Sequence, residues 1–417
     1  MSALRRVPAA QATGDQPRLA MPFVEFVGLI ALLMALTALS IDIMLPALPQ
    51  IDATFSLAHL NNDRQLVITS YFIGFAPAQL IYGTLSDRFG RRRLLFAGLL
   101  IYLAATLLAI WAPSFEALLV ARALQGVGTA APRVIAVAIV RDLFSGRQMA
   151  RVMSFTMMVF ITLPVIAPTI GLGLLQLGSW RLSFWLLAAV ALTAMVWAAW
   201  RLPETRSSAA LAAHPKLGLI EAATLALANR QSRGYAIAIG FIHGSLFGYI
   251  VSAQQIFVDV FGLNERFPLV FGAVAAVMIA ALFTNARLVQ RFGMRRLSHL
   301  ALVGFIAASM VMMLVGLSPR PSLLAFCLPL SAAFYLFQLI LPNFNAIAMQ
   351  PLGRIAGMAS SLIGFYTTAV ATLCGWLIGQ QFNGSVLPLA VGFVVLGALA
   401  MIAVLSVETR GGMFHGE

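Results

Sequence analysis

Long apolar runs without a charged residue constrain this chain more than any other feature. Leu94–Ala112, Leu182–Trp200 and Gly234–Val258 contain no Asp, Glu, Lys or Arg, and neither does Ile355–Val407. A helix needs about 20 consecutive apolar residues to cross the hydrocarbon of a bilayer. Such uniform runs predict transmembrane helices rather than the short alternating strands of a membrane barrel.

The composition indicates that lipid is the main solvent. Of the 417 residues, 61% are hydrophobic and only 10% are charged, whereas soluble domains contain about 25% charged residues. The net charge of +13 comes from short basic clusters between the apolar runs. Because these clusters do not form one stripe, nucleic acid is not an expected partner. Cys327 and Cys374 lie in apolar runs without metal-type spacing, so we expect neither a disulfide framework nor a metal site.

Turn and charge signals divide the apolar runs into twelve expected helices. The expected fold is an all-α integral membrane protein with two six-helix bundles. Its predicted parts are an N-terminal tail (1–21), a first bundle (22–201), a linker (202–233), a second bundle (234–406) and a C-terminal tail (407–417). The expected helices cover residues 22–48, 64–84, 94–112, 117–140, 151–175, 182–201, 234–258, 267–286, 297–317, 322–349, 357–380 and 386–406.

The distribution of basic residues predicts the orientation in the membrane. With the N-terminus inside, 21 of the 27 Arg and Lys residues lie in inner segments, 4 lie in outer loops and 2 lie in the fourth helix. Basic residues are retained on the cytoplasmic side of membrane proteins. Both termini are therefore expected in the cytoplasm. The N-terminal tail has no apolar stretch before Pro22, so a cleaved signal peptide is not expected.

Two loops repeat one pattern at equivalent places in the two halves. "GTLSDRFGRRRL" (Gly83–Leu94) follows the second helix, and "ARLVQRFGMRRL" (Ala286–Leu297) follows the eighth. Leu, Arg-Phe-Gly, Arg-Arg and Leu recur in register at an offset of 203 residues. Internal repeats of this kind are typical of secondary transporters.

Four motifs, the last of them made of two segments, resemble signatures of the major facilitator superfamily. "GTLSDRFGRRR" resembles its loop signature after helix two, and "RALQGVGTAA" (Arg122–Ala131) is similar to its helix-four signature. "LPVIAPTIGLG" (Leu163–Gly173) is similar to the helix-five motif of antiporters, although two usual glycines are missing. "SIDIMLPALP" (Ser40–Pro49) and "LPNFNAIAM" (Leu341–Met349) further resemble the Bcr/CflA drug-resistance subgroup. The resemblance implies two pseudo-symmetric bundles in a bacterial inner membrane.

The loop after helix two is expected to form a gate on the cytoplasmic side. The family pattern implies that Asp87 faces the start of helix eleven, near residues 356 and 357, where the helix dipole favours a carboxylate. It also implies that Arg88 or Arg91 pairs with Asp142. The alternative is a basic loop that serves only topology. The predicted gate consists of Gly83, Asp87, Arg88, Gly90, Arg91 and Asp142.

The helix-five segment is predicted to bend and to pack closely. Pro164 and Pro168 remove two backbone donors within about one turn, which bends a helix. Gly171 and Gly173 permit close contact between helices. An ordinary kinked membrane helix is the alternative, since such kinks occur in many membrane proteins.

Three ionisable residues inside the apolar runs are predicted to couple transport to protons. Asp42 follows 16 residues without charge, and Arg122 and Arg133 lie on nearly one face of helix four. Burial favours the protonated form of a carboxyl group, and a nearby arginine favours the charged form. We expect Asp42 to accept the proton and Arg122 to adjust the proton affinity of Asp42. The alternative is that Asp42 forms a structural ion pair. Pro46 and Pro49 are expected to close this first helix at the outer face.

Polar and aromatic residues at helical spacing are candidates for lining a substrate cavity, although helix packing is the commoner reason for such spacing. No motif for an enzyme or for ATP binding is present, so neither a catalytic residue nor a cofactor beyond the proton gradient is expected. The candidate lining residues are Tyr71, Phe75, Gln125, His243, Gln254, Tyr335, Gln338, Asn345 and Tyr366.

The expected function is proton-driven export of small, largely apolar drug-like compounds by a monomeric carrier. A proton-coupled exporter or symporter of a small metabolite is the alternative on the same fold, because fold does not fix substrate or direction. A membrane receptor or scaffold is disfavoured, because it has no need of a costly buried acid such as Asp42.

Overall fold

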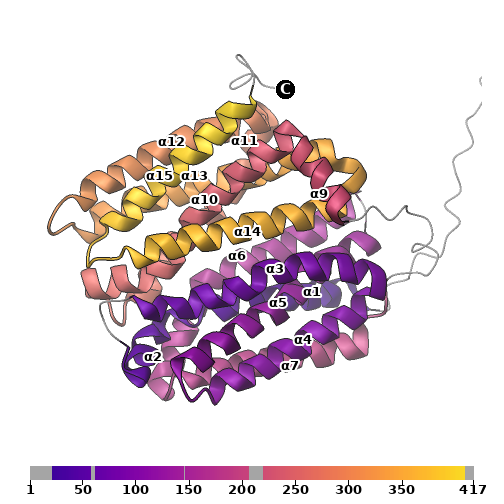
Figure 1. Cartoon of the computed structure of the whole chain (residues 1–417), viewed down its shortest axis with the longest axis horizontal. Helices are drawn as coiled ribbons and strands as arrows, with labels where there is room; N and C mark the ends of the chain where they lie inside the picture. The colour runs from indigo at the N-terminus through magenta and orange to yellow at the C-terminus, as the bar shows by residue number, and fades with distance from the viewer. Residues whose placement is uncertain (1–20, 58–61, 145, 206–218, 409–417) are drawn as a thin grey trace, which may run out of the picture.

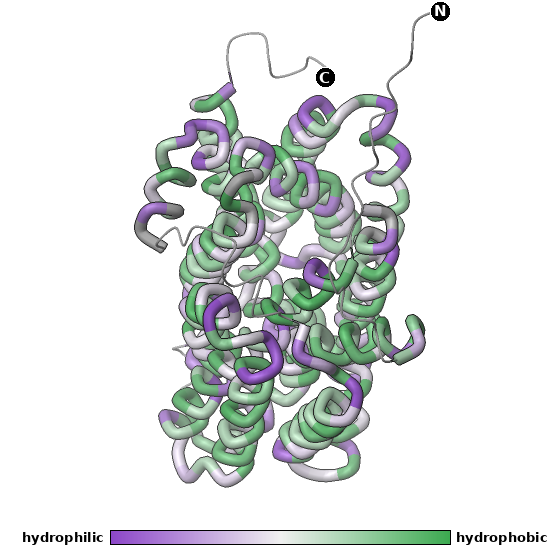
Figure 2. The backbone as a smooth tube through the Cα atoms, turned by 90° about the vertical axis from the view of Figure 1, so that its right-hand side faces the viewer, coloured by the Kyte–Doolittle hydropathy of each residue, from purple (hydrophilic) through white to green (hydrophobic). Residues whose placement is uncertain are grey.

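The structure is a computed structural model that describes residues 21–57, 62–144, 146–205 and 219–408. These residues are almost entirely helical, and they contain twelve helical segments long and apolar enough to cross a membrane. The predicted all-α integral membrane fold is therefore confirmed. In Figure 2 the helices are coloured mainly as hydrophobic, and most hydrophilic residues lie near the turns.

The two halves of the chain form two helical bodies that lie against each other. Figure 1 shows the first six spans below and the last six above, with α3 and α14 adjacent between them. The first half contains α1 (Phe23–Asp42), α2 (Leu48–Phe55), α3 (Leu66–Phe89), α4 (Arg91–Ile110), α5 (Phe115–Leu143), α6 (Gly146–Leu177) and α7 (Arg181–Arg201). The rest contains α9 (Leu219–Ala228), α10 (Arg230–Gln254), α11 (Phe267–Phe292), α12 (Met294–Gly316), α13 (Leu323–Met349), α14 (Ala356–Gln380) and α15 (Leu387–Val407).

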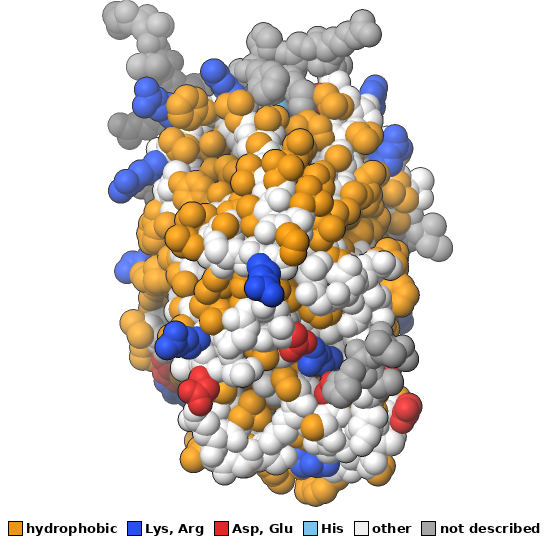
Figure 3. All heavy atoms as spheres, turned by 90° about the vertical axis from the view of Figure 1, so that its left-hand side faces the viewer, with side chains coloured by type: hydrophobic (Ala, Val, Ile, Leu, Met, Phe, Trp, Pro, Cys, Tyr) orange, Lys and Arg blue, Asp and Glu red, His pale blue; other side chains and the backbone are white. Residues whose placement is uncertain are grey.

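An even number of spans brings the start of α1 and the end of α15 to the same face of the molecule. We call this the tail face, which is on the right in Figure 1. The opposite face carries α2 and is called the far face. Figure 3 views the molecule from that side and shows broad areas of hydrophobic side chains with few, scattered charges.

The first span continues beyond the point where the sequence predicted its end. After α1 ends at Asp42, a 3₁₀ turn (Leu45–Ala47) and α2 extend it to Phe55. Pro46 and Pro49 each lie in the first turn of one of these segments. Proline is tolerated there because the N–H it lacks would have no helical partner. Helix α1 itself ends four residues before Pro46, as proline requires, but these prolines do not close the span, because they begin new helical turns.

The predicted linker also contains regular structure. Helix α9 lies within residues 202–233, and α10 begins at Arg230, four residues before the expected start of the seventh helix. The Asn229 side chain accepts a hydrogen bond of 2.9 Å from the backbone N–H of Ser232 and so caps α10. An N-cap asparagine satisfies one of the donors that a helix start leaves open. Residues 206–218 of the linker lie outside the described residues.

Candidate functional site

Asp42 is a buried acid that lies where the two halves of the protein meet. It is the last residue of α1 and only 4% exposed. Within the described part of the chain, no hydrogen bond or ion pair reaches its carboxylate. The Tyr249 hydroxyl from α10 lies within electrostatic range of Asp42, and it is itself buried without a hydrogen bond to any described residue. Both residues lie 19 positions after the first residue of their helices, so they occupy matching heights in the two halves.

Arg122 forms no ion pair or hydrogen bond with Asp42 among the described residues, so the ion pair considered as an alternative is not found there, and the tuning of Asp42 by Arg122 stays a prediction. Its guanidinium group donates to the carbonyl oxygens of Ser40 (2.9 Å) and Val67 (3.0 Å) and to the Gln125 side chain. It also lies 4.8 Å from the ring centre of Tyr71. Arg122 is fully buried, and these contacts supply the partners that a buried guanidinium group requires. Arg122, which belongs to α5, therefore links this helix to α1 and α3 by hydrogen bonds.

Arg133 differs from Arg122 because it has no acidic partner and no oxygen acceptor among the described residues. Its guanidinium group lies 3.9 Å from the sulfur of Met34 and 5.0 Å from the ring centre of Phe160. It also acts electrostatically on His243 of α10. The His243 ring packs against Phe337 at a centroid distance of 6.0 Å. Arg133 is thus a cation at the interior surface between the halves.

The tail-face loop contains an ionic cluster centred on Arg91. The buried Arg91 side chain bonds to Asp142 (2.9 Å), Asp87 (2.8 Å) and Ser86 (2.7 Å). Of the two arginines proposed as partners of Asp142, Arg91 makes the contact. Arg88 instead lies 5.5 Å from the ring centre of Phe89. The approach of Asp87 to residues 356 and 357 stays a prediction.

Gly83 and Gly171 mark close contacts between helices, whereas a Cβ atom at Gly173 would meet no described neighbour within 4 Å, so the close contact expected at Gly173 is wrong. A Cβ atom at Gly83 would clash with the Ser361 side chain, so α3 and α14 approach closely near the tail face. A Cβ atom at Gly171 would clash with the carbonyl oxygen of Ile43, the residue after Asp42. Pro164 and Pro168 lie inside the continuous helix α6. The helix-five motif therefore packs directly beside the buried acid.

Glu204 is a member of the tail-face cluster that sequence reasoning missed. It accepts hydrogen bonds of 3.0 and 3.1 Å from the backbone N–H groups of Arg91 and Arg92, at the start of α4. The second half uses Glu408, which binds Arg295 and the hydroxyl group of Tyr235. The sequence Glu-Thr-Arg occurs at 204–206 and again at 408–410, and this repeat is the feature of the sequence that could have pointed to both acids.

A second missed group joins the two halves at the far face. Gln255 donates to Asn62 at 2.8 Å and accepts a hydrogen bond from Gln65. Arg64 forms an ion pair with Asp259 of the other half. Residues Gln255–Val260 form a π-helical turn. This turn allows the consecutive residues Gln254 and Gln255 to be buried together, and such turns are frequent at functional sites.

The candidate lining residues differ in their surroundings. Gln125 is engaged by Arg122 and by Thr106, so its amide group has little capacity left for a substrate. Gln254 is buried, and neither atom of its amide group has a partner among the described residues. Asn345 is exposed, whereas the nearby Asn343 is buried and donates to Asn285 at 2.7 Å. The buried candidates are Tyr71, Phe75, Gln125 and Gln254, and the half-buried ones are His243, Tyr335, Gln338 and Tyr366.

The family model of the Major Facilitator Superfamily matches residues 30–374. The match includes both halves and the described site from Asp42 to Gln254. The chain belongs to the Major Facilitator Superfamily. The family resemblance that the motifs suggested is therefore confirmed.

Curated members of the superfamily match most of the chain. An uncharacterized MFS-type transporter YdgK of Bacillus subtilis is 30% identical over 93% of this chain and 96% of its own length. A bicyclomycin resistance protein homolog of Haemophilus influenzae is 27% identical over 91% of this chain and 94% of its own length. The multidrug resistance protein MdtL of Shewanella oneidensis is 27% identical over 85% of this chain and 89% of its own length. These relatives support the drug-resistance subgroup and a transporter rather than an enzyme.

Two solved transporter structures have the same fold. The human organic anion transporter MFSD10 matches 93% of this chain and 100% of its own with a TM-score of 0.68 and 18% identity. A bacterial homolog of the human lysosomal transporter Spinster matches 94% of this chain and 96% of its own chain, with a TM-score of 0.66 and 17% identity. At this identity the likeness concerns the fold alone.

Proposed function

We propose that this protein is a proton-coupled efflux transporter that exports small, largely apolar, drug-like compounds by alternating access. The observation that carries the proposal is the buried Asp42 carboxyl group, which has no ion pair in the described part of the chain. An ionisable group inside a membrane protein is costly and is retained for function. The drug-resistance names of the relatives in Haemophilus and Shewanella support a drug-like substrate.

The mechanism follows from the place of Asp42 between the halves. A charged carboxylate is unfavourable in a dry interface, whereas the protonated form tolerates it. Protonation of Asp42 therefore favours the state in which α1 and α10 lie together, near Tyr249. Loss of the proton favours hydration of this interface and separation of the halves. A carrier that binds either a proton or a substrate at this place exchanges one for the other.

The proposed orientation places the tail face in the cytoplasm of a bacterial cell, with the protein in the inner membrane as a monomer. The basic residues of the two repeated loops lie at this face, as retention of positive charge on the cytoplasmic side requires. Drug export then moves substrate from the tail face to the far face, and protons move in the opposite direction.

The proposal is tested with the full chain expressed in a drug-sensitive bacterium and reconstituted into liposomes. Wild-type protein is expected to give resistance to some compounds of a panel and to export them only while a pH gradient is present. Asp42→Asn is expected to abolish this export, and Asp63→Asn, which removes another acid of the first half, is the matched control. Full gradient-driven export by Asp42→Asn, or export that persists with a proton ionophore, would contradict the proposal.

A second candidate function is export or symport of a small anionic metabolite. Arg133 favours it, because this interior cation has no acidic partner among the described residues. A substrate carboxylate would supply the missing charge. Under this function, organic anions compete with the transported drug in wild-type protein but not in Arg133→Gln. Equal competition in both proteins would leave the drug-export proposal as the better one.

A further inference from the structure

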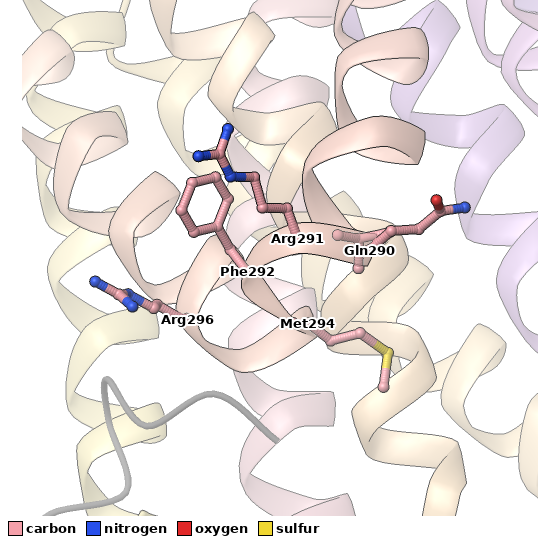
Figure 4. A pocket seen from close by; sticks show the side chains of 7 residues that line it. Gln290, Arg291, Phe292, Met294 and Arg296 are labelled. Carbon is pink, nitrogen blue, oxygen red and sulfur yellow. The ribbon is translucent and has the colours of Figure 1, made fainter.

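The loop between α11 and α12 forms an open pocket of about 350 Å³ at the tail face. Arg291, Phe292 and Arg296 line it, and Figure 4 shows the two arginines extending on the same side as the Phe292 ring. Their guanidinium carbons lie 5.5 and 5.9 Å from the centre of this ring. Both arginines are exposed, and within the described ranges neither has an ion pair. The pocket thus presents two uncompensated positive charges beside one aromatic ring.

The corresponding loop of the first half holds an anion. There, the Glu204 carboxylate receives hydrogen bonds from the first backbone N–H groups of α4, directly after Gly90. Gly90 and Gly293 have nearly the same backbone angles, with φ of 95° and 76° and ψ of 153° and 162°. The second loop therefore repeats the conformation that binds a carboxylate in the first. Its own acid, Glu408, is bound by side chains of Arg295 and Tyr235 instead.

A lipid-facing stripe of α12 leads directly to this pocket. Arg296, Leu300 and Val303 follow one another at intervals of four and three residues, which places them on one helix face. Leu300 and Val303 are 50% and 47% exposed, and Phe283 on the neighbouring α11 is 61% exposed. Apolar side chains so exposed on a membrane helix contact acyl chains. Arg296 and Arg291 then lie at the height of the lipid headgroups.

We propose that this pocket binds the phosphate group of an anionic phospholipid from the leaflet that borders the tail face. The two guanidinium groups contact the phosphate oxygens, and the acyl chains lie along Leu300 and Val303. Arginine binds phosphate well because its planar N–H groups match the phosphate oxygens. A lipid is favoured over free inorganic phosphate, because the apolar stripe is continuous with the charged pocket. Basic pockets at the ends of membrane helices are suited to such headgroups.

The test uses the full-length purified protein and measures lipid retention and stability. Phosphatidylglycerol, phosphatidylcholine and inorganic phosphate are each titrated into the protein in detergent. Bound lipid is counted by native mass spectrometry, and the thermal midpoint is recorded. Arg291→Gln with Arg296→Gln removes the proposed site. Arg266→Gln with Arg320→Gln removes the same charge from exposed positions at the far face and is the matched control.

Phosphatidylglycerol is expected to bind the wild type and to raise its thermal midpoint, whereas phosphatidylcholine and inorganic phosphate are not. The Arg291/Arg296 variant is expected to bind phosphatidylglycerol about tenfold more weakly, and the far-face control to bind it normally. Replacing both arginines by lysine keeps the charge and is expected to retain most of the binding. Equal lipid binding by the Gln variant and the wild type would overturn the proposal. Equal loss in the far-face control, or an equal effect of inorganic phosphate, would also overturn it.

Discussion

Arg122 binds the carbonyl oxygen of Ser40 at 2.9 Å, two residues before Asp42, and leaves the Asp42 carboxylate without an ion pair in the described part of the chain. The buried arginine therefore holds the backbone of α1 in place, and the acid keeps its freedom to gain or lose a proton. A direct ion pair would fix Asp42 in its charged form. The two residues thus have separate tasks, which makes their variants distinguishable.

Arg122→Gln is expected to destabilise the protein by about 3 kcal/mol or more. The variant loses hydrogen bonds from a charged group to Ser40, Val67 and Gln125, and each such bond contributes about 1.5–3 kcal/mol. Thermal unfolding in detergent measures the effect. Arg133→Gln is the matched control, with an expected loss below about 1 kcal/mol, because the contacts of Arg133 with described residues are to a sulfur atom and an aromatic ring. Equal losses in both variants would disprove the assigned role of Arg122.

Tyr249→Phe is expected to raise stability by about 1 kcal/mol while it reduces transport driven by a pH gradient. The hydroxyl group is buried and has no hydrogen-bond partner among the described residues, so its removal relieves a desolvation cost. Transport is expected to fall because Tyr249 is a polar group of the second half that lies within electrostatic range of Asp42. Thermal unfolding and liposome transport measure the two effects.

Tyr235→Phe provides the matched control for this prediction. The Tyr235 hydroxyl group donates to Glu408 at 2.5 Å and lies 2.8 Å from the His299 ring nitrogen. Its removal is expected to lower stability by about 1–3 kcal/mol, because buried partners lose a hydrogen bond. If Tyr249→Phe loses as much stability as Tyr235→Phe, the Tyr249 hydroxyl group has a partner that the described contacts do not include.

The membrane spans were predictable from the sequence because they depend on local runs of apolar residues. The structure places α14 at Ala356–Gln380, where the sequence predicted 357–380. The pairing of Arg91 with Asp142 could also be anticipated, because the loop motif contains Arg91 and the family pattern implies an acidic partner at the end of helix four. The end of the first span was predicted too early, because proline can both end one helical segment and lie in the first turn of the next, as Pro46 and Pro49 do.

The partners of buried groups could not be predicted in the same way. The acceptors of Arg122 are mainly backbone carbonyl oxygens, which carry no signature in a sequence. The pairing of Gln65 with Gln255 joins residues 190 positions apart and depends on how the two halves pack. Glu204 could have been noticed, because the Glu-Thr-Arg sequence that contains it recurs at Glu408. Its role could not be predicted, because that role depends on the start of α4 lying beside it.

Two glycines of the helix-five motif are expected to respond differently to the same substitution. Gly171→Ala forces a Cβ atom against the carbonyl oxygen of Ile43, beside Asp42, and is expected to reduce transport strongly. Gly173→Ala meets no atom within 4 Å and is expected to be neutral or to stabilise the helix by up to about 1 kcal/mol. Liposome transport at matched protein levels is the measurement. Equal activity of both variants would show that contact between α6 and α1 is unimportant for transport.

Linking the far ends of α3 and α10 is expected to stop transport. Gln65 and Gln255 belong to different halves and share a hydrogen bond. Cysteines at both positions, with Cys327 and Cys374 replaced by serine, are joined by a short reducible bifunctional thiol reagent. Alternating access requires the far ends to separate, so cross-linked protein is expected to be inactive and to recover when the link is reduced.

The control for this experiment links two residues of the same half. Gln231 and Gln350 also share a hydrogen bond, of 3.4 Å, and both belong to the second half. A link between cysteines at these positions is expected to leave transport intact, because each half moves as one body in rocking-type carriers. If the Gln65–Gln255 link is as harmless as this control, the far-face contacts do not separate during transport, and substrate must leave the protein by another route.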